Sequence, residues 1–345
     1  MQLQHTGSMS VGADIAPSRP TASPRRRTII RHTRRVAGTL GFLSGGLASG
    51  ILALAYYVTH RITQPTPVTA YDSYVMTPYE LGAPYQDVAF PTVDATLLRG
   101  WWLERPDSRG VIIVCGGYRG RRADLLGIGT ALWRSGSNVL MFDYRGHGEL
   151  AGTGVTLGYH ELEDLLAAVD WGKGRVEGAR VGVIGYSMGA SISIMAAARD
   201  SDIRAVVADS AFSTQRGAVS LGVRRVLHMP HGILLNTVDL LLGVVGGYHF
   251  RDVEPVREIA LVAPRPILLI HGDEDSVTSV HDTEALYAAA AEPKEMWISP
   301  GVEHCGTYFA DRQVYCKRVA DFFARALAAP STEVTARPME APAAR

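Results

Sequence analysis

The stretch Val181-Gly182-Val183-Ile184-Gly185-Tyr186-Ser187-Met188-Gly189 decides the fold of this chain. Its apolar start predicts a buried strand, Gly-x-Ser-x-Gly predicts a tight turn, and the small residues at 190–198 predict a helix. Glycines two positions to either side of Ser187 remove side chains that would clash in such a turn. A strand–turn–helix unit of this kind holds the serine hydroxyl at the end of a sheet, so Ser187 is predicted to be a nucleophile.

A serine hydroxyl is a weak nucleophile, and the groups that would activate it follow later in the chain. The acidic stretch Asp273-Glu274-Asp275 comes directly after a strand-like run at 267–270, and His304 comes after a second strand-like run at 296–298. An imidazole takes the serine proton, and a carboxylate holds the ring in the correct tautomer. The residues alone leave the choice of carboxylate open.

The chain order serine, acid, histidine resembles that of the α/β-hydrolase superfamily. The resemblance runs from about Tyr74 to Leu327, and it includes a first hairpin at 94–102 and an Asp-x-Arg-Gly-x-Gly turn at 143–148. The family pattern His-Gly-x-x-Asp implies that the acid is Asp275. Asp273 is then expected to order the loop around it.

The resemblance also implies an oxyanion hole formed by the backbone N–H groups of Tyr118 and Met188. The strand-like run at 111–114 leads into a loop at 115–120, where the family usually reads His-Gly-x. Gly116 stands in place of that histidine, a departure that leaves the backbone donor in the chain. Losing one such donor typically costs on the order of 10²–10³ in rate.

Alternating strand-like and helix-like segments predict a mostly parallel sheet of eight strands with helices on both faces, within a hydrolase domain at 74–328. The predicted strands lie near 85–90, 97–104, 111–114, 138–142, 180–184, 205–209, 266–270 and 294–298. The predicted helices lie near 121–135, 160–173, 188–199, 279–291 and 310–328. Residues 213–262 fall between two core strands and predict a small helical cap insertion. Its apolar faces either pack on the core or form a lid over an acyl-binding pocket.

Residues 36–59 contain no charged side chain and are long enough to span a bilayer as a helix. Seven arginines precede this segment, so the positive-inside rule places the basic, predicted-disordered segment 1–35 in the cytoplasm and the catalytic domain outside. Ala53-Leu54-Ala55 also fits the cleavage site of an export signal, so a domain exported after cleavage is an alternative. Five glycines lower the hydrophobicity of the segment, so a buried or interfacial helix in a soluble protein is a further alternative. Residues 60–73 predict a linker, and 329–345 predict a disordered tail.

The composition fits a full-sized globular domain and argues against one class of partner. The chain has 345 residues, 47% of them apolar, and a formal net charge of +0. Setting aside the seven arginines and one acidic residue of 1–35 leaves a mildly acidic remainder, which argues against nucleic acid as a partner. The three cysteines show no paired framework. The histidines outside the candidate triad have no carboxylate or cysteine at a convincing ligand spacing, so no metal site is predicted. The serine chemistry needs no organic cofactor either.

Together these features predict a serine hydrolase that cleaves carboxylic esters of a small-molecule substrate through an acyl-enzyme. Thioesterase, peptidase and acyltransferase chemistry use the same groups and remain alternatives. A non-catalytic, membrane-tethered binding protein is the alternative from another class. Such proteins generally lose a member of the triad, whereas this chain retains all three.

Overall fold

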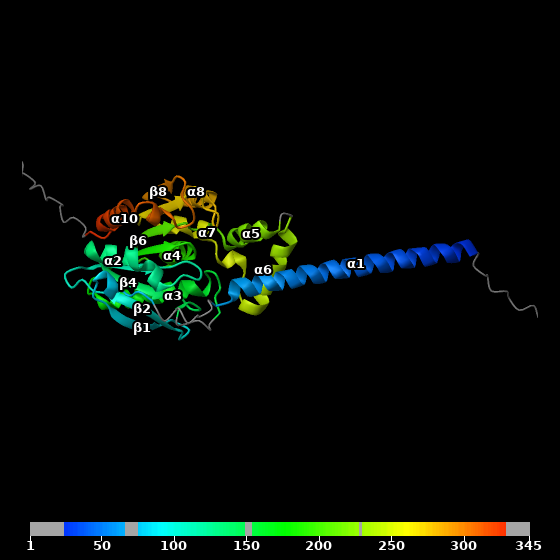
Figure 1. The fold of residues 1–345 in the computed structure, drawn as a ribbon, viewed down its shortest axis with the longest axis horizontal. Helices are drawn as coiled ribbons and strands as arrows, with labels where there is room; N and C mark the ends of the chain where they lie inside the picture. The colour runs from blue at the N-terminus through cyan, green and yellow to red at the C-terminus, as the bar shows by residue number, and fades with distance from the viewer. Residues whose placement is uncertain (1–23, 66–74, 149–153, 228–229, 329–345) are drawn as a thin grey trace, which may run out of the picture. The chain divides into compact units, whose positions relative to one another are not determined.

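The computed structural model describes residues 24–65, 75–148, 154–227 and 230–328, and it describes side chains from residue 44 onward. Compactness divides the chain into one unit ending at Leu52 and a second unit that begins at Ala53. The predicted disorder of 1–23 and 329–345, and most of the predicted linker, lie outside the described residues. The second unit contains every described strand (Figure 1).

Helix α1 runs from Pro24 to Thr63, so it begins before and ends after the segment 36–59. Helix therefore replaces the disorder expected for 24–35 and the linker expected for 60–63. No proline interrupts the sequence between Pro24 and Pro65, and the residue before a proline is pushed out of the helical region. The last turns of α1, from residue 53 on, belong to the second unit.

None of the helices in the described part of the chain is, by itself, both long enough and apolar enough to cross a membrane. Gly232–Gly246 and Phe250–Val262 pass that test only as a pair, and a bend of 74° separates them. The membrane-spanning segment predicted for 36–59 is therefore not supported. The position of the catalytic domain outside the cytoplasm stays a prediction.

Eight strands form one sheet in the order β1-β2-β4-β3-β5-β6-β7-β8. The β1–β2 and β2–β4 pairs are antiparallel, and every other neighbouring pair is parallel. This confirms the predicted mostly parallel, eight-stranded sheet. The strands are β1 (Gln86–Pro91), β2 (Leu97–Leu103), β3 (Gly110–Cys115), β4 (Asn138–Asp143), β5 (Arg180–Tyr186), β6 (Ile203–Asp209), β7 (Ile267–Gly272) and β8 (Lys294–Ser299).

Helices cover both faces of the sheet. Strand β3 shows this arrangement, because its alternate residues point to opposite faces and pack into two different cores. Val111 and Ile113 belong to the core that includes residues of α3 and α4, whereas Ile112 and Val114 belong to the core that includes residues of α2 and α10. A strand buried on both faces needs an unbroken apolar run. The helices of this region are η3 (Arg122–Leu125), α2 (Leu126–Arg134), α3 (His160–Arg175), α4 (Met188–Arg199), α8 (Val280–Ala289), α9 (Thr307–Ala310) and α10 (Arg312–Ala326).

The segment between β6 and β7 forms a helical layer over a third apolar cluster. Its helices are α5 (Gln215–Val226), α6 (Gly232–Gly246), η5 (Phe250–Asp252), α7 (Pro255–Glu258) and η6 (Ile259–Val262). A separate short helix, η2 (Pro78–Leu81), precedes β1. The third cluster joins residues of α5 and α6 to Ala55, Val58 and Ile62 of α1. The end of α1 therefore packs as part of this layer.

A buried ion pair fixes the turn after β4. The Arg145 guanidinium lies 2.6 Å from Asp164 and 2.7 Å from Asp94, and the Asp164 side chain is fully buried. Burial raises the pKa of Asp164 to about 6, against the opposing effect of the Arg145 hydrogen bonds. A lone carboxylate at this place would be buried without a counter-charge.

We expect Arg145→Met to lower the free energy of unfolding by about 3–5 kcal/mol, because it leaves Asp164 buried and unpaired. Urea denaturation of Arg145→Met and of the double variant Arg145→Met/Asp164→Asn provides the measurement. The double variant should recover a large part of the loss, since it removes the stranded charge. A single variant as stable as the wild type would contradict this assignment.

A second buried carboxylate joins the sheet to α10. The Tyr315 hydroxyl donates a hydrogen bond of 2.8 Å to the carboxylate of Asp209, and Asp209 is 0% exposed. The same hydroxyl lies 3.1 Å from the hydroxyl of Tyr186. Burial raises the pKa of Asp209 from 3.8 to about 6, although the hydrogen bonds from Tyr315 and Ser210 oppose it. The folded protein therefore holds this proton more tightly than the unfolded chain does.

The contribution of Asp209 to stability is thus expected to be complete below about pH 4 and to decrease as the pH rises towards about 6. Asp209→Asn keeps an acceptor for Tyr315 but removes the titration. Relative to the wild type, its free energy of unfolding should rise by roughly 3 kcal/mol across that window. Urea midpoints of both proteins at pH 4 to 7 test this, and a difference that does not change with pH would refute it.

Candidate active site

Ser187 lies in a strained turn between β5 and α4. Its φ is 53° and its ψ is −117°, in a region that non-glycine residues rarely adopt. A Cβ on Gly185 would lie 2.2 Å from the carbonyl oxygen of Gly189, and a Cβ on Gly189 would lie 2.4 Å from that of Gly116. Only glycine fits at these two positions, which explains the spacing seen in the sequence.

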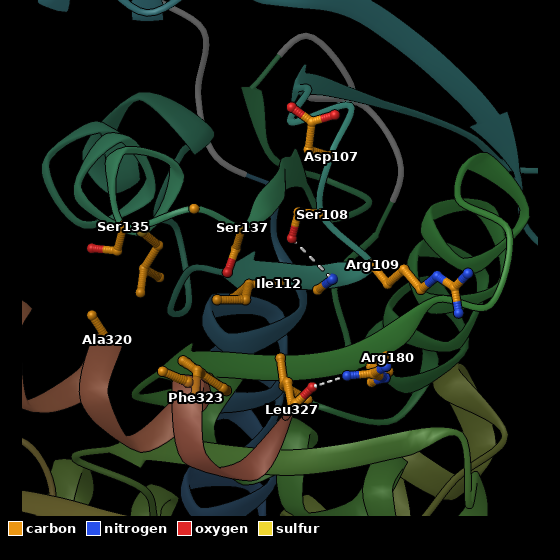
Figure 2. A pocket seen from close by; sticks show the side chains of 14 residues that line it. Asp107, Ser108, Arg109, Ile112, Ser135, Ser137, Arg180, Ala320, Phe323 and Leu327 are labelled. Atoms are coloured by element: carbon orange, nitrogen blue, oxygen red, sulfur yellow. Dashed lines mark hydrogen bonds between the residues drawn. The ribbon is translucent and has the colours of Figure 1, made fainter. Parts of the chain in front are cut away.

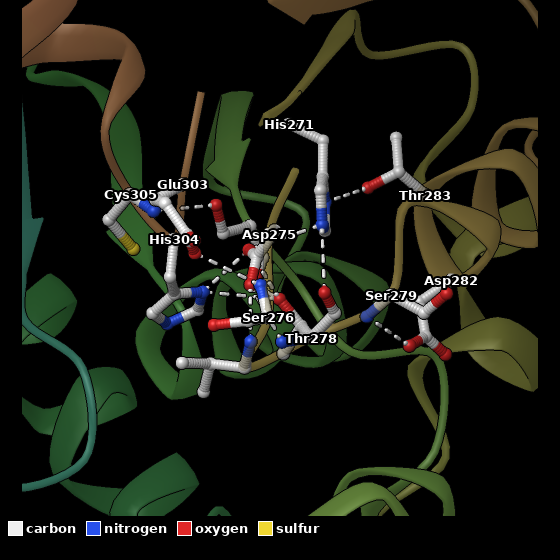
Figure 3. Close-up of polar contacts among 12 residues, drawn as sticks. His271, Asp275, Ser276, Thr278, Ser279, Asp282, Thr283, Glu303, His304 and Cys305 are labelled. Atoms are coloured by element: carbon white, nitrogen blue, oxygen red, sulfur yellow. Dashed lines mark hydrogen bonds and ion pairs between the residues drawn. The ribbon is translucent and has the colours of Figure 1, made fainter. Parts of the chain in front are cut away.

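His304 and Asp275 form a close pair. The Nδ1 atom of His304 lies 2.6 Å from Oδ2 of Asp275, whose side chain is fully buried, whereas the His304 side chain is 19% exposed (Figure 3). A proton on Nδ1 satisfies this contact and leaves Nε2 as the basic nitrogen. The structure thus brings together two of the three residues expected in the triad.

Ser187 and His304 line the same cavity, of about 240 Å³. Among the described residues, no hydrogen bond joins the Ser187 hydroxyl to the His304 ring. Catalytic hydrogen bonds of unliganded enzymes are often long and tighten only when substrate binds. The three predicted residues come from the carboxyl ends of β5, β7 and β8, the edge where ligands bind in open α/β sheets.

A second histidine, which the sequence analysis did not connect to the site, contacts the same carboxylate. His271 is fully buried at the end of β7, and its Nε2 lies 3.3 Å from Oδ2 of Asp275. Its Nδ1 lies 2.7 Å from the Thr283 hydroxyl. The two imidazoles approach Asp275 from different directions (Figure 3). The available signal was the His-Gly pair itself, which begins the pattern that ends at Asp275.

The surroundings of Asp275 favour its charged form. Burial alone would raise the pKa of this carboxyl, but hydrogen bonds from His271 and His304, together with the backbone N–H of Thr278, hold the pKa well below its usual range. The N–H groups of Val277 and Thr278 donate bonds of 2.7 and 2.9 Å to Oδ1. Asp275 is therefore a fixed negative charge beside His304.

The neighbouring carboxylate has a different position. Asp273 is exposed, and its Oδ1 accepts a hydrogen bond of 2.6 Å from the N–H of Gly301, at the start of the loop that carries His304. This loop crosses directly over Gly272, where a Cβ would lie 2.1 Å from the carbonyl oxygen of Val302. Asp273 thus orders the histidine loop without contacting the imidazole.

The end of β6 joins the three loops of the site. The N–H of Ser187 donates to the carbonyl of Asp209 at 2.8 Å. The Ser210 hydroxyl accepts the N–H of Cys305, next to His304, at 3.1 Å, and the Thr278 hydroxyl donates to the Ser210 carbonyl at 3.1 Å. Ser210 itself has a φ of 58°. This dipeptide therefore fixes the relative positions of all three loops.

The expected oxyanion loop, residues 115–120, lies against the nucleophile. A Cβ on Gly117 would lie 3.0 Å from the Cβ of Ser187, so a side chain at this position would crowd the nucleophile. Tyr118 and Met188 both line the larger cavity that Ser187 borders. Their role as backbone donors to an oxyanion stays a prediction.

His147 holds this loop from behind, a role that the sequence analysis missed. Its Nε2 accepts the N–H of Arg119 at 2.8 Å, and its Nδ1 lies 2.6 Å from the carbonyl of Arg145. A single ring proton on Nδ1 satisfies both contacts. Arg119 has a φ of 64°, so the loop bends sharply at this point. The position of His147 inside the turn at 143–148 was the only sequence signal.

Two cavities meet at Ser187. The smaller one is lined by His304 and Cys305, and the larger one, of about 470 Å³, is lined mainly by apolar residues of α1 and α5. Another cavity, of about 430 Å³, lies at the opposite, amino ends of β3 and β5, where Arg109 and Arg180 line it (Figure 2). None of the predicted site residues borders that cavity.

Two of the cysteines lie close to the candidate site, and burial keeps both of them protonated. Burial raises the pKa of Cys115 to about 11 and that of Cys305 well above its ordinary value, so both remain thiols. Within the described ranges, no group of three or more His, Cys, Asp or Glu residues is arranged to hold a metal ion. Ser187 is therefore the nucleophile candidate that the geometry favours.

Several known proteins are similar to this chain. Residues 106–240 match the family profile described as serine aminopeptidase, S33. Protein YqkD of Bacillus subtilis is 30% identical over 65% of this chain and 74% of its own length. The alpha/beta hydrolase domain-containing protein WAV2 of Arabidopsis thaliana is 24% identical over 81% of this chain and 91% of its own length. An esterase of Pyrococcus furiosus has a similar structure, with a TM-score of 0.63 and 27% identity, covering 77% of this chain and 98% of the esterase.

The matched residues 106–240 include strands β3 to β6 and Ser187, and they end before Asp275 and His304. With its eight-stranded, mostly parallel sheet and its helices on both faces, this chain belongs to the α/β-hydrolase superfamily and is a hydrolase.

Proposed function

We propose that this protein is a serine hydrolase that cleaves carboxylic esters of a small-molecule substrate through an acyl-enzyme. The observation that carries the proposal is the 2.6 Å contact between His304 and the buried Asp275, beside a cavity that Ser187 also borders. The similarity to an esterase at 27% identity supports the ester bond as the substrate bond.

The proposed reaction has two halves. The Ser187 Oγ attacks the carbonyl carbon of the ester while Nε2 of His304 takes the hydroxyl proton, and Asp275 stabilises the imidazolium. The N–H groups of Tyr118 and Met188 donate to the oxyanion of the tetrahedral intermediate. His304 then protonates the leaving alkoxide, and a water molecule, deprotonated by the same ring, releases the acid.

A second candidate is the cleavage of peptide or amide bonds, because the family profile that matches is described as serine aminopeptidase. An aminopeptidase must bind the ammonium group of its substrate, and a carboxylate is the natural partner for it. Among the residues that the structure describes, none that lines the larger cavity is a carboxylate, whereas Asp124 lines the smaller one. Turnover of aminoacyl p-nitroanilides above that of p-nitrophenyl esters would favour this candidate.

We expect p-nitrophenyl ester hydrolysis and covalent labelling by a fluorophosphonate to depend on Ser187. Ser187→Ala should abolish labelling and lower kcat by a factor of 10³ or more, on the order seen when a triad nucleophile is removed. Ser135→Ala is the matched control, because Ser135 lies exposed at the end of α2 and lines the remote cavity but neither of the two cavities at Ser187. Full activity of Ser187→Ala would refute the proposal.

Replacing Asp275 should lower kcat far more than replacing its neighbour Asp273. Asp275→Asn places an amide beside His304 and favours the wrong tautomer, so kcat should fall on the order of 10⁴, as in the serine protease template. Asp273→Asn still presents an oxygen to the N–H of Gly301, so it should cost less than about tenfold. Steady-state kinetics of both variants decide the assignment. Loss of turnover only in Asp273→Asn would reverse it.

A further inference from the structure

Two cavities open onto Ser187, and they differ in the groups that border them. His304 lines the smaller cavity, of about 240 Å³, whereas Tyr118 and Met188 line the larger one, of about 470 Å³. His304 must reach the leaving oxygen in order to protonate it. The leaving group therefore belongs in the smaller cavity, and the acyl group belongs in the larger one.

One wall of the larger cavity comes from the last turns of α1. Leu54, Tyr57, Val58, Arg61 and Ile62 line it, and their spacing of three and four residues places them on one face of the helix. Ala55 and Thr59, on another face, are buried. The helix end therefore has one face fixed against the protein and one face on the cavity.

The oxyanion loop fastens this helix end. The carbonyl of Arg61 accepts the Tyr118 hydroxyl at 2.9 Å and the Arg119 guanidinium at 3.2 Å. The last four carbonyls of a helix have no partner inside the helix, and a cation is favourable at this end. The loop expected to supply an oxyanion donor thus also positions the wall of the larger cavity.

A second part of the wall comes from α5, through Val219, Val223 and Val226. At the mouth, Tyr57 is 58% exposed and Val226 is 78% exposed. Large apolar side chains on both sides of an open mouth become buried when an alkyl chain runs between them. The volume lies within the range of about 300–1,000 Å³ of small-molecule pockets, and the described residues that line the cavity include no carboxylate.

The geometry points to an acyl-chain site built jointly by the end of α1 and α5, which selects esters with a medium or long alkyl acyl chain and a compact leaving group. This inference rests on the proposed esterase function and adds to it a substrate class and a wall of the site. Residues 54–62 act in it as specificity residues, although they lie outside the hydrolase domain that the sequence delimits.

The test compares kcat/KM of the full chain for p-nitrophenyl octanoate and p-nitrophenyl acetate. The double variant Leu54→Ala/Tyr57→Ala should lower the octanoate-to-acetate ratio at least fivefold, because the chain loses apolar contacts on one side. Tyr56→Ala is the matched control, since Tyr56 is 60% exposed but does not line the cavity. It should leave the ratio unchanged.

A second pair of variants fills the cavity instead of trimming it. A Cβ on Gly222 of α5 meets no atom within 4 Å, and this residue lines the cavity, so Gly222→Phe should obstruct the alkyl chain without a clash in the folded protein. Its octanoate-to-acetate ratio should fall at least tenfold. Gly174→Phe, at an equally open glycine of α3, is the control.

The outcomes separate the two proposals. Ser187-dependent hydrolysis with an unchanged ratio in both cavity variants would overturn the acyl-chain site and leave the esterase function in place. A ratio that falls equally in the control variants would also overturn it. Absence of both ester hydrolysis and fluorophosphonate labelling in the wild type would overturn the esterase function and this inference with it.

Discussion

The close backbone approach around Ser187 is the constraint on which the site depends. Gly185 and Gly189 allow β5 to turn into α4 within one residue, and this turn forces Ser187 to a positive φ. The strain is maintained because the N–H of Ser187 is bound to β6 and the first turn of α4 begins immediately after it. Backbone strain of this kind costs on the order of 1–3 kcal/mol and persists only where the surrounding structure fixes it. Here the surrounding structure is a sheet buried on both faces, which fixes the hydroxyl at the edge where the other loops end.

The remaining groups of the site reach that edge through hydrogen bonds between loops rather than through packing. Ser210 binds the histidine loop with its hydroxyl and the acid loop with its carbonyl, and Asp209 next to it binds the nucleophile turn. His147 performs a similar role for the loop at 115–120. Each of these contacts comes from a residue that has no direct part in the proposed chemistry. The precision of the site is therefore a property of the strand ends as a group.

Local sequence carried enough information for the sheet, and it indicated which residues to propose for the triad. The run at 111–114 is apolar without interruption because both faces of β3 are buried, and the glycines around Ser187 are required by contacts within the same turn. The roles of His271 and His147 could not be predicted in this way, since each depends on loops that meet only in the folded protein. The same reason explains why the second unit begins at Ala53, because residues 53–63 contact α5, α6, the loop at 115–120 and Val155. Hydropathy described this segment only as an apolar helix.

The buried position of Ala55 has a consequence for processing of the chain. Ala53-Leu54-Ala55 fits an export-signal cleavage site, yet Ala55 is 0% exposed and belongs to the third apolar cluster. A protease acting on the folded protein would have to unwind the end of α1 to reach this bond, since peptide cleavage requires an extended, accessible backbone. Cleavage there would also create a new ammonium group one residue before Tyr57, at the mouth of the larger cavity. Because Leu54 lines this cavity, the same cleavage would remove part of its wall. The point at which the N-terminus is cut would then decide which residues line the site.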